Sequence, residues 1–434
     1  MVVFHPILRA PASNDQRSQE ANGSFEYSTT ALYIQDRDEA WGICEGATRG
    51  LPSPDTRGSG ASPTSKKPPL IDLPTEDSSS FMSFTPFGIC SCCPQNERPK
   101  HGECPAWVQV SYDSCCQSFR NTLLMNFPAP GLIPTNGIEL EVFAAGSGKP
   151  VVLCHGWPEH AFSWRHQIEP LAKAGYHVIA PNQRGYGNST APAAVTDYDI
   201  EHLCGDLVGL LDHYGYEKAA FVGHDWGAIV VWAMSVLYPD RVEAVINLSV
   251  PYLQRGTTDW VSFWEKHLGG DFYIVHFNRQ PGVADTAFGA NTRQFLRNLY
   301  RTNQWQHPAT DLGPGMAMLR IAERDSLPGD ALMSDDELNV FASAFEKNSF
   351  TPGINWYRNF TRNWEILGRV EERVRQPSLM IYGQYDMVRK SDTLPQVVAD
   401  LEVVTLACGH WIQQERPLET NAAMLDWLGR RYPA

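Results

Sequence analysis

The sequence predicts an α/β protein built on a mainly parallel sheet. Short apolar segments with the composition of strands recur along the chain after residue 150, and amphipathic helical segments separate them. Each of these segments is short and apolar on both faces, as strands buried between two layers of helices must be. Strands that alternate with helices in this way are typical of a parallel sheet that helices cover on both faces.

An edge hairpin is expected first, around residues 137–146, where apolar and polar residues alternate. The expected buried strands then cover residues 151–154, 177–180, 219–222, 242–248, 379–382 and 403–406. Helical patterns fill the intervals, for example at residues 160–175, 199–215 and 417–432. Residues 253–369 form a much longer interval, rich in aromatic residues at helical spacing. This interval predicts a helical cap inserted over the sheet.

Composition divides the chain further. Residues 51–80 consist mostly of Pro, Ser, Gly and Thr, and seven of the ten cysteines precede residue 121. We therefore expect residues 1–125 to be a low-complexity extension, either disordered or the product of a misplaced start codon with Met125 as the true start. The core of the α/β domain is expected in residues 126–252 and 370–434, on either side of the cap.

Charge and hydrophobicity exclude several classes of partner. The formal net charge of -14 repels polyanions, so neither nucleic acid nor an anionic membrane surface is an expected partner. The most apolar helical segment, residues 228–238, has about half of the roughly 20 residues that a membrane span needs. Export signals are absent from the first residues, which predicts a cytoplasmic location. The cysteine spacing matches no zinc motif, so no metal site is expected.

The sharpest motif is a strand that runs into a helix through Gly-x-nucleophile-x-Gly. Asp225 occupies the nucleophile position, between Gly223 and Gly227. Glycines are needed at both places because the backbones of strand and helix approach too closely for a Cβ atom. The alternative is an ordinary strand-to-helix turn in which Asp225 serves only as the helix N-cap.

With these residues the chain resembles the α/β-hydrolase family, in the branch with an Asp nucleophile that contains soluble epoxide hydrolases and the related haloalkane dehalogenases. The resemblance extends over roughly residues 126–432. It implies a mainly parallel eight-stranded sheet with helices on both faces and an inserted helical cap. Asp386 and His410 each follow a later strand, and the order Asp225, Asp386, His410 is the order of nucleophile, acid and base that this fold uses.

A second family element is the loop Cys154-His155-Gly156-Trp157-Pro158-Glu159, which follows a strand. The resemblance implies that the backbone N–H groups of Trp157 and Trp226 form an oxyanion hole. It also implies an aromatic substrate pocket, in which we expect His155, Trp157, Trp226 and Trp356 to bind the substrate.

A carboxylate nucleophile favours attack on a saturated carbon, because an ionised Asp needs no base and forms an ester with its substrate. His410, oriented by Asp386, would then activate water that cleaves this ester. An epoxide oxygen also needs an acid. In the cap, Tyr357 belongs to the segment Asn355-Trp356-Tyr357-Arg358, which resembles the NWYR segment of soluble epoxide hydrolases and carries their ring-opening tyrosine.

Tyr273 is the best match to the second cap tyrosine of that family, although its distance in sequence from Pro281 and Gly282 is one residue longer than in the family pattern. The other interpretation of both tyrosines is that they are merely packed aromatic residues.

The resulting hypothesis is a cofactor-independent epoxide hydrolase whose partners are a small apolar epoxide and water, and whose product is a vicinal diol. Haloalkane dehalogenase is the alternative, since it shares Asp225, His410 and the capped fold, and the Trp226 indole could bind halide. The usual second halide donor is replaced here by Trp157. A binding protein that has lost catalysis is the third hypothesis. Oligomeric state and physiological substrate are left open by the sequence.

Overall fold

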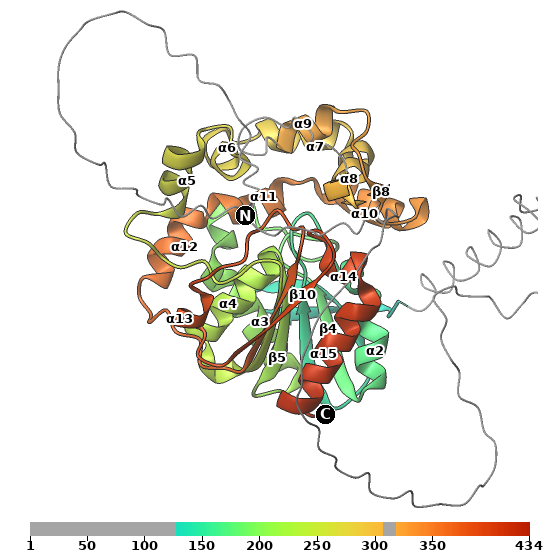
Figure 1. The fold of residues 1–434 in the computed structure, drawn as a ribbon, viewed down its shortest axis with the longest axis vertical. Helices are drawn as coiled ribbons and strands as arrows, with labels where there is room; N and C mark the ends of the chain where they lie inside the picture. The colour runs from blue at the N-terminus through green and yellow to red at the C-terminus, as the bar shows by residue number, and fades with distance from the viewer. Residues whose placement is uncertain (1–126, 307–317) are drawn as a thin grey trace, which may run out of the picture. The chain divides into compact units, whose positions relative to one another are not determined.

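An eight-stranded sheet lies at the centre of the computed structural model, which describes residues 127–306 and 318–434 (Figure 1). Its strands are β1 (Pro130–Thr135), β2 (Ile138–Ala145), β3 (Lys149–Cys154), β4 (Tyr176–Asn182), β5 (Ala219–His224), β6 (Val242–Leu248), β9 (Ser378–Gly383) and β10 (Leu401–Leu406). Their order is β1-β2-β4-β3-β5-β6-β9-β10. Only the pairs β1–β2 and β2–β4 are antiparallel. The predicted fold class, with its edge hairpin, is confirmed; the predicted extension, residues 1–125, lies outside the described residues.

The strands differ in burial according to their place in the sheet. Every residue of the central strands β5 and β9 is buried, as the apolar sequences predict. The expectation of two buried faces is wrong for residues 403–406, because β10 is the last strand of the sheet. Val403 on that strand is 52% exposed. An edge strand needs an apolar face only where helices cover it.

Helices cover both faces of the sheet. On one face α3 (Ile200–Tyr214), α4 (Trp226–Leu237) and α13 (Leu394–Val397) bury one hydrophobic cluster, and on the other α2 (Ile168–Lys173) and α15 (Pro417–Arg431) bury a second. Short helical turns at η1 (Ala161–Trp164), η2 (Val195–Tyr198), η3 (Pro239–Arg241) and α14 (Ile412–Glu415) complete the connections. Among the helices of the described ranges, none is long and apolar enough to cross a membrane.

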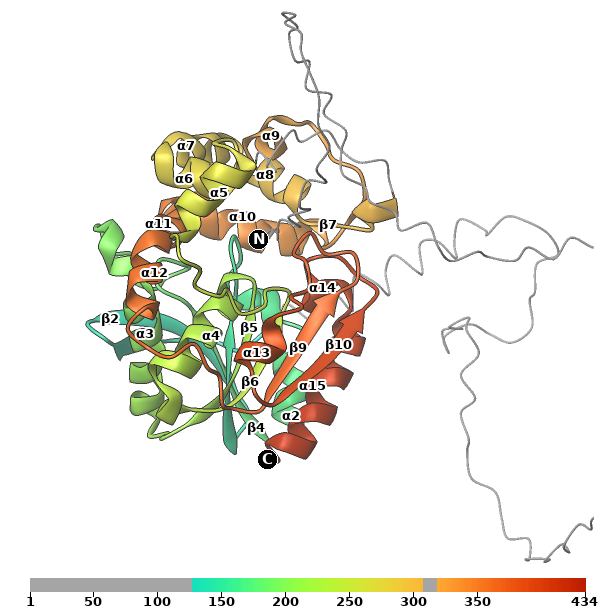
Figure 2. The ribbon, with the colours of Figure 1, turned by 60° about the vertical axis from the view of Figure 1, so that its left-hand side comes forward.

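A group of helices between β6 and β9 lies over one end of the sheet (Figures 1 and 2). It consists of α5 (Trp260–Leu268), α6 (Tyr273–Arg279), α7 (Val283–Ala290), α8 (Thr292–Leu299), η4 (Gln304–Gln306), α9 (Met318–Glu323), α10 (Asp335–Asn348), α11 (Thr351–Arg358) and α12 (Phe360–Leu367). A two-residue pairing of β7 (Arg301–Thr302) with β8 (Asp330–Ala331) was not expected. We refer to these elements as the cap; the boundaries set at residues 252 and 369 stay a prediction.

Local sequence explains where the main helices begin and end. Asp199 accepts a hydrogen bond from the His202 N–H at 3.0 Å and so caps the start of α3. Gly215 ends that helix with a φ of 73°, which favours glycine. In the cap, Ser334 and Glu337 form a reciprocal capping box at the start of α10.

The turn after β4 is fixed to α3 by a buried ion pair. The Arg184 guanidinium donates two hydrogen bonds to the Asp206 carboxylate, at 2.8 and 2.6 Å, and both side chains are 3% exposed. Asn136 donates a further hydrogen bond to Asp206 at 3.0 Å. Burial raises the pKa of Asp206, although the Arg184 contacts oppose this effect.

We expect Arg184→Met to lower the free energy of unfolding by about 3–5 kcal/mol, because it leaves a buried carboxylate without its counter-charge. The double variant Arg184→Met/Asp206→Leu removes that unpaired charge and should lose less stability than the single variant. Urea unfolding of the wild type and both variants measures this difference. An Arg184→Met variant as stable as the wild type would show that the ion pair with Asp206 does not stabilise the fold.

Candidate active site

Asp225 lies at a sharp turn between β5 and α4. Its φ of 52° and ψ of -117° are unfavourable for a residue with a side chain. A Cβ atom on Gly223 would lie 2.4 Å from the Gly227 carbonyl oxygen, and one on Gly227 would lie 1.9 Å from the Cys154 carbonyl oxygen. The Asp225 side chain makes no capping hydrogen bond to α4. Its carboxylate is therefore available at the carboxyl end of the sheet.

The loop after β3 passes directly beside this carboxylate. The Trp157 N–H donates a hydrogen bond to Asp225 Oδ1 at 2.9 Å. Gly156 permits this approach, because a Cβ atom there would lie 2.5 Å from the Cβ of Asp225. Trp226 supplies the first N–H of α4, and the first N–H groups of a helix have no partner within that helix. The two expected oxyanion donors thus flank the same side chain.

His410 lies between two carboxylates. Its Nε2 is 3.7 Å from Asp225 Oδ2, and its Nδ1 is 3.0 Å from Asp386 Oδ1. The Ser249 hydroxyl lies 3.1 Å from the same Nδ1. Burial by itself raises the pKa of Asp386, but His410 and the hydrogen bonds to the carboxylate outweigh it and hold that pKa below its ordinary value. Asp386 therefore stays ionised and lies within hydrogen-bonding distance of His410 Nδ1.

A second acid–histidine pair, which the sequence analysis missed, lies behind the first. His224 Nδ1 is 2.7 Å from Glu159 Oε2, and its Nε2 is 2.9 Å from the His410 carbonyl oxygen. Both side chains are fully buried. Burial alone would lower the pKa of His224, but Glu159 outweighs burial and raises it to about 9. A charged His224 donates to both partners and fixes the backbone of His410.

The two cap tyrosines lie together above this site. Their ring centroids are 5.8 Å apart, and the Tyr357 ring is 5.4 Å from the Trp157 ring and 5.1 Å from the Trp226 ring. Burial is the main reason that the pKa of Tyr273 and of Tyr357 is raised above the ordinary range, with Asp225 adding to the effect. Both phenols therefore keep their protons at neutral pH.

The residues next to Tyr357 explain its position. The Trp356 indole donates a hydrogen bond to the Arg184 carbonyl oxygen at 3.2 Å, which fastens α11 to the turn after β4. Asn278 on α6 donates to the Tyr357 carbonyl oxygen at 3.0 Å, and Arg358 donates to the Phe277 carbonyl oxygen at 3.2 Å. These bonds fix the helix of Tyr357 to the core and to the helix of Tyr273.

Of the four residues expected to contact the substrate, His155 and Trp356 instead bind other parts of the protein. His155 is fully buried, and its ring nitrogens lie 2.9 Å from the Gly156 carbonyl oxygen and 3.0 Å from the Gln183 nitrogen. Trp356 is also fully buried. Their geometry favours a role in holding the loop and α11, rather than in substrate contact.

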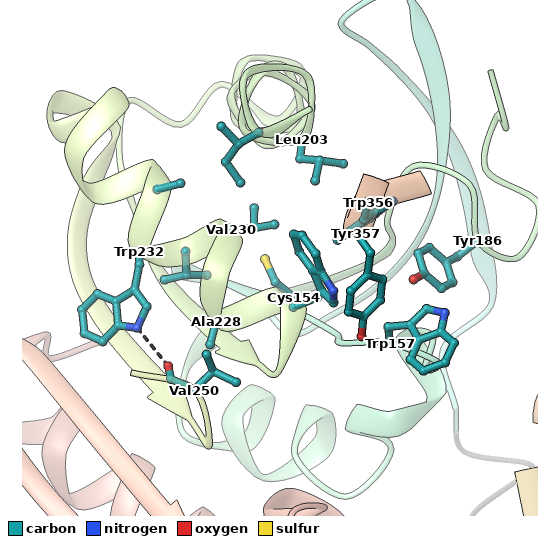
Figure 3. Close-up of a cluster of buried hydrophobic side chains, with 14 of the residues drawn as sticks. Cys154, Trp157, Tyr186, Leu203, Ala228, Val230, Trp232, Val250, Trp356 and Tyr357 are labelled. Atoms are coloured by element: carbon teal, nitrogen blue, oxygen red, sulfur yellow. Dashed lines mark hydrogen bonds between the residues drawn. The ribbon is translucent and has the colours of Figure 1, made fainter. Parts of the chain in front are cut away.

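The other two expected contacts, Trp157 and Trp226, have buried indole nitrogens that find no hydrogen-bond partner within the described residues. Figure 3 shows Trp157 beside Tyr357 and Tyr186. The rings of Phe277, Phe288 and Phe295 surround Trp157 at 5.6–6.4 Å between centroids. The space next to Asp225 is therefore bounded by aromatic rings.

Comparisons with known proteins agree with this geometry. Residues 149–417 match the family model of the α/β hydrolase fold. Epoxide hydrolase A of Mycobacterium tuberculosis is 43% identical over 321 residues, which cover 70% of this chain and 98% of that protein. Epoxide hydrolase 2 of Siraitia grosvenorii is 36% identical over 310 residues, 68% of this chain and 96% of the relative.

Solved structures give the same result. The crystal structure of epoxide hydrolase A from Mycobacterium thermoresistibile superposes with a TM-score of 0.63 at 41% identity, covering 69% of this chain and 98% of that chain. Potato (Solanum tuberosum) epoxide hydrolase I gives a TM-score of 0.62 at 31% identity, with 70% and 99% covered. Because the family model and the relatives span most of the described residues, the chain belongs to the epoxide hydrolase family of the α/β-hydrolase fold.

Proposed function

We propose that this protein hydrolyses epoxides to vicinal diols through a covalent ester on Asp225. The observation that carries the proposal is the position of the Asp225 carboxylate, 3.7 Å from the His410 imidazole and beneath a pair of protonated cap tyrosines. The relatives named as epoxide hydrolases support the substrate class. The aromatic rings around Trp157 favour a small apolar epoxide.

In the first step, Asp225 attacks a carbon of the epoxide. Oδ1 is held by the Trp157 N–H, so Oδ2 is the atom that forms the new C–O bond. The ring C–O bond breaks, and its oxygen becomes an alkoxide that is about as basic as hydroxide. Tyr357, assisted by Tyr273, donates a hydrogen bond to this oxygen and then transfers a proton to it.

In the second step, water attacks the carbonyl carbon of the Asp225 ester. His410 Nε2 takes a proton from that water, and the ionised Asp386 stabilises the imidazolium. Charge develops on Oδ1, where the N–H groups of Trp157 and Trp226 receive it. The ester C–O bond breaks, and the leaving oxygen takes the second proton of that water, so the diol leaves and Asp225 is again a carboxylate. The proton on His410 then passes to the Tyr357 phenolate and restores the phenol. Epoxide and water are the only reactants, and each residue returns to its starting state.

The haloalkane dehalogenase hypothesis uses the same nucleophile but a different leaving group. Halide leaves without an acid, so the dehalogenase needs neither cap tyrosine. The unpartnered indole nitrogens of Trp157 and Trp226 are the feature that fits halide. A comparison of substrates therefore separates the two activities.

We expect the purified full chain to convert aryl and alkyl epoxides to diols and to release no halide from chloro- or bromoalkanes. The reason is the pair of tyrosines at Asp225, which serves an epoxide oxygen only. Diol formation is measured by chromatography and halide release with an ion-selective electrode. Halide release without diol would make the dehalogenase activity correct and the epoxide proposal wrong.

The variant His410→Gln should trap the ester. It retains Asp225 and the tyrosines, so alkylation proceeds, but it lacks the base for the second step. Intact-mass spectrometry after addition of an epoxide should find a mass increase equal to the mass of that epoxide. Asp225→Ala is the control and should stay unmodified and inactive. An unmodified His410→Gln protein would refute the division into two steps.

Alkylation should not slow between pH 7 and pH 10 through loss of the phenolic proton. The raised pKa of Tyr357 keeps the acidic form present as pH rises through this range. The rate is measured as single-turnover adduct formation in His410→Gln. Adding Tyr357→Phe should slow that rate by about 10²-fold or more.

Tyr252→Phe is the matched control for that variant. The Tyr252 hydroxyl is buried without a partner among the described residues, and Tyr252 lines a separate cavity together with Ile229 and Trp232. Removing this hydroxyl should leave the alkylation rate unchanged. If the adduct forms equally fast in His410→Gln and in His410→Gln/Tyr357→Phe, Tyr357 has no role in ring opening.

A further inference from the structure

Glu415 is a buried acidic residue that lies next to the loop of His410 and takes no part in the reaction steps described above. It is the last residue of α14 and is 9% exposed. A carboxylate that is removed from water is tolerated only where it accepts hydrogen bonds. The donors around this carboxylate therefore indicate what it does in the fold.

The two carboxylate oxygens hold the backbone on both sides of His410. The Gly409 N–H donates a hydrogen bond to Glu415 Oε2 at 3.0 Å, and the Trp411 N–H donates to Oε1 at 3.1 Å. The Glu415 N–H donates to the Trp411 carbonyl oxygen at 2.7 Å, and this turn folds the side chain back towards the loop. A further bond to Oε2 comes from the Thr302 hydroxyl at 3.0 Å. Both oxygens thus bind a direct neighbour of His410.

The backbone of His410 itself is held by a second charged side chain. His224 Nε2 lies 2.9 Å from the His410 carbonyl oxygen. Hydrogen bonds in which one partner is charged are roughly twice as strong as neutral ones. Glu415 and His224 together therefore fix the backbone of His410 and of both its neighbours, while Asp386 holds the imidazole ring.

We propose that Glu415 is a positioning residue for ester hydrolysis, because it holds His410 where Nε2 can take a proton from the attacking water. This inference rests on the proposed function. A base must lie within about 2.6–3.2 Å of the group that it deprotonates, and a misplacement of about 1 Å can cost about 10²-fold in rate. Attack by Asp225 on the epoxide does not use this base. Glu415 should therefore matter for the second step and not for the first.

The variant Glu415→Gln tests this role, because it keeps the size of the side chain and removes its charge. An amide has one acceptor oxygen and one NH₂ group, so at least one of the two backbone N–H groups loses its acceptor. Single-turnover mixing with an epoxide, acid quenching and intact-mass spectrometry follow the rise and the decay of the Asp225 ester. The rise should keep its wild-type rate, and the decay should slow by about 10-fold or more.

Glu141→Gln is the matched control. Glu141 is also buried, and its carboxylate accepts hydrogen bonds from the Asn188 N–H at 2.9 Å and the Asn182 side chain at 2.6 Å. It lies on β2, near the opposite edge of the sheet from β10. The same substitution there should leave both rates unchanged. A loss of stability alone lowers the fraction of protein that forms the ester, but not the rate at which folded molecules hydrolyse it.

Glu415→Asp is a second variant, which serves if Glu415→Gln does not fold. It keeps the charge but has a shorter side chain, so its ester should decay more slowly than in the wild type and faster than in Glu415→Gln. Decay at the wild-type rate in folded Glu415→Gln, or in Glu415→Asp where only that variant folds, would overturn the inference. A wild-type protein that forms neither ester nor diol would instead refute the proposed function, and this inference with it.

Discussion

The close contact between helix α4 and the loop after β3 is the constraint on which the candidate site depends. Gly227 packs so tightly that a Cβ atom would lie 1.9 Å from the Cys154 carbonyl oxygen. This contact brings the Asp225 carboxylate within 2.9 Å of the Trp157 N–H. The unfavourable backbone of Asp225 persists because β5 is hydrogen-bonded between β3 and β6, so the sheet holds the turn that the local chain would not adopt alone.

Two acid–histidine pairs lie next to that turn. Asp386 orients the imidazole of His410, while the buried His224–Glu159 pair holds the His410 carbonyl oxygen. The raised pKa of His224 means that it is charged in the folded protein up to about pH 9. The stability that this charge contributes is complete below the ordinary histidine pKa and is lost as pH rises through 9. His224 therefore stays charged at neutral pH and keeps donating to the His410 carbonyl oxygen.

Much of this arrangement could be predicted from the sequence, because short motifs encode backbone geometry locally. The glycines around Asp225 predict the turn, and the positions of Asp386 and His410 after strands place them at one edge of a parallel sheet. The Glu159–His224 pair was not predictable in the same way, since each residue has an ordinary place in its own motif. They become a buried pair only because the loop after β3, which carries Glu159, packs against the end of β5, which carries His224. The exposure of β10 and the engagement of His155 likewise follow from tertiary neighbours that no local pattern specifies.

The cap is coupled to the core by backbone contacts next to the residues that face the site. Trp356 binds the Arg184 carbonyl oxygen, and Arg184 is itself fixed to α3 by the buried pair with Asp206. The position of the Tyr357 ring beside the Trp157 and Trp226 rings therefore depends on contacts that begin at the sheet. Under the proposed mechanism, a cap movement that breaks the Trp356 bond would separate the acid Tyr357 from the nucleophile Asp225. Ring opening under the proposed mechanism then requires the closed cap, whereas ester hydrolysis, which uses Asp386, His410 and the two backbone N–H groups, depends on the core alone.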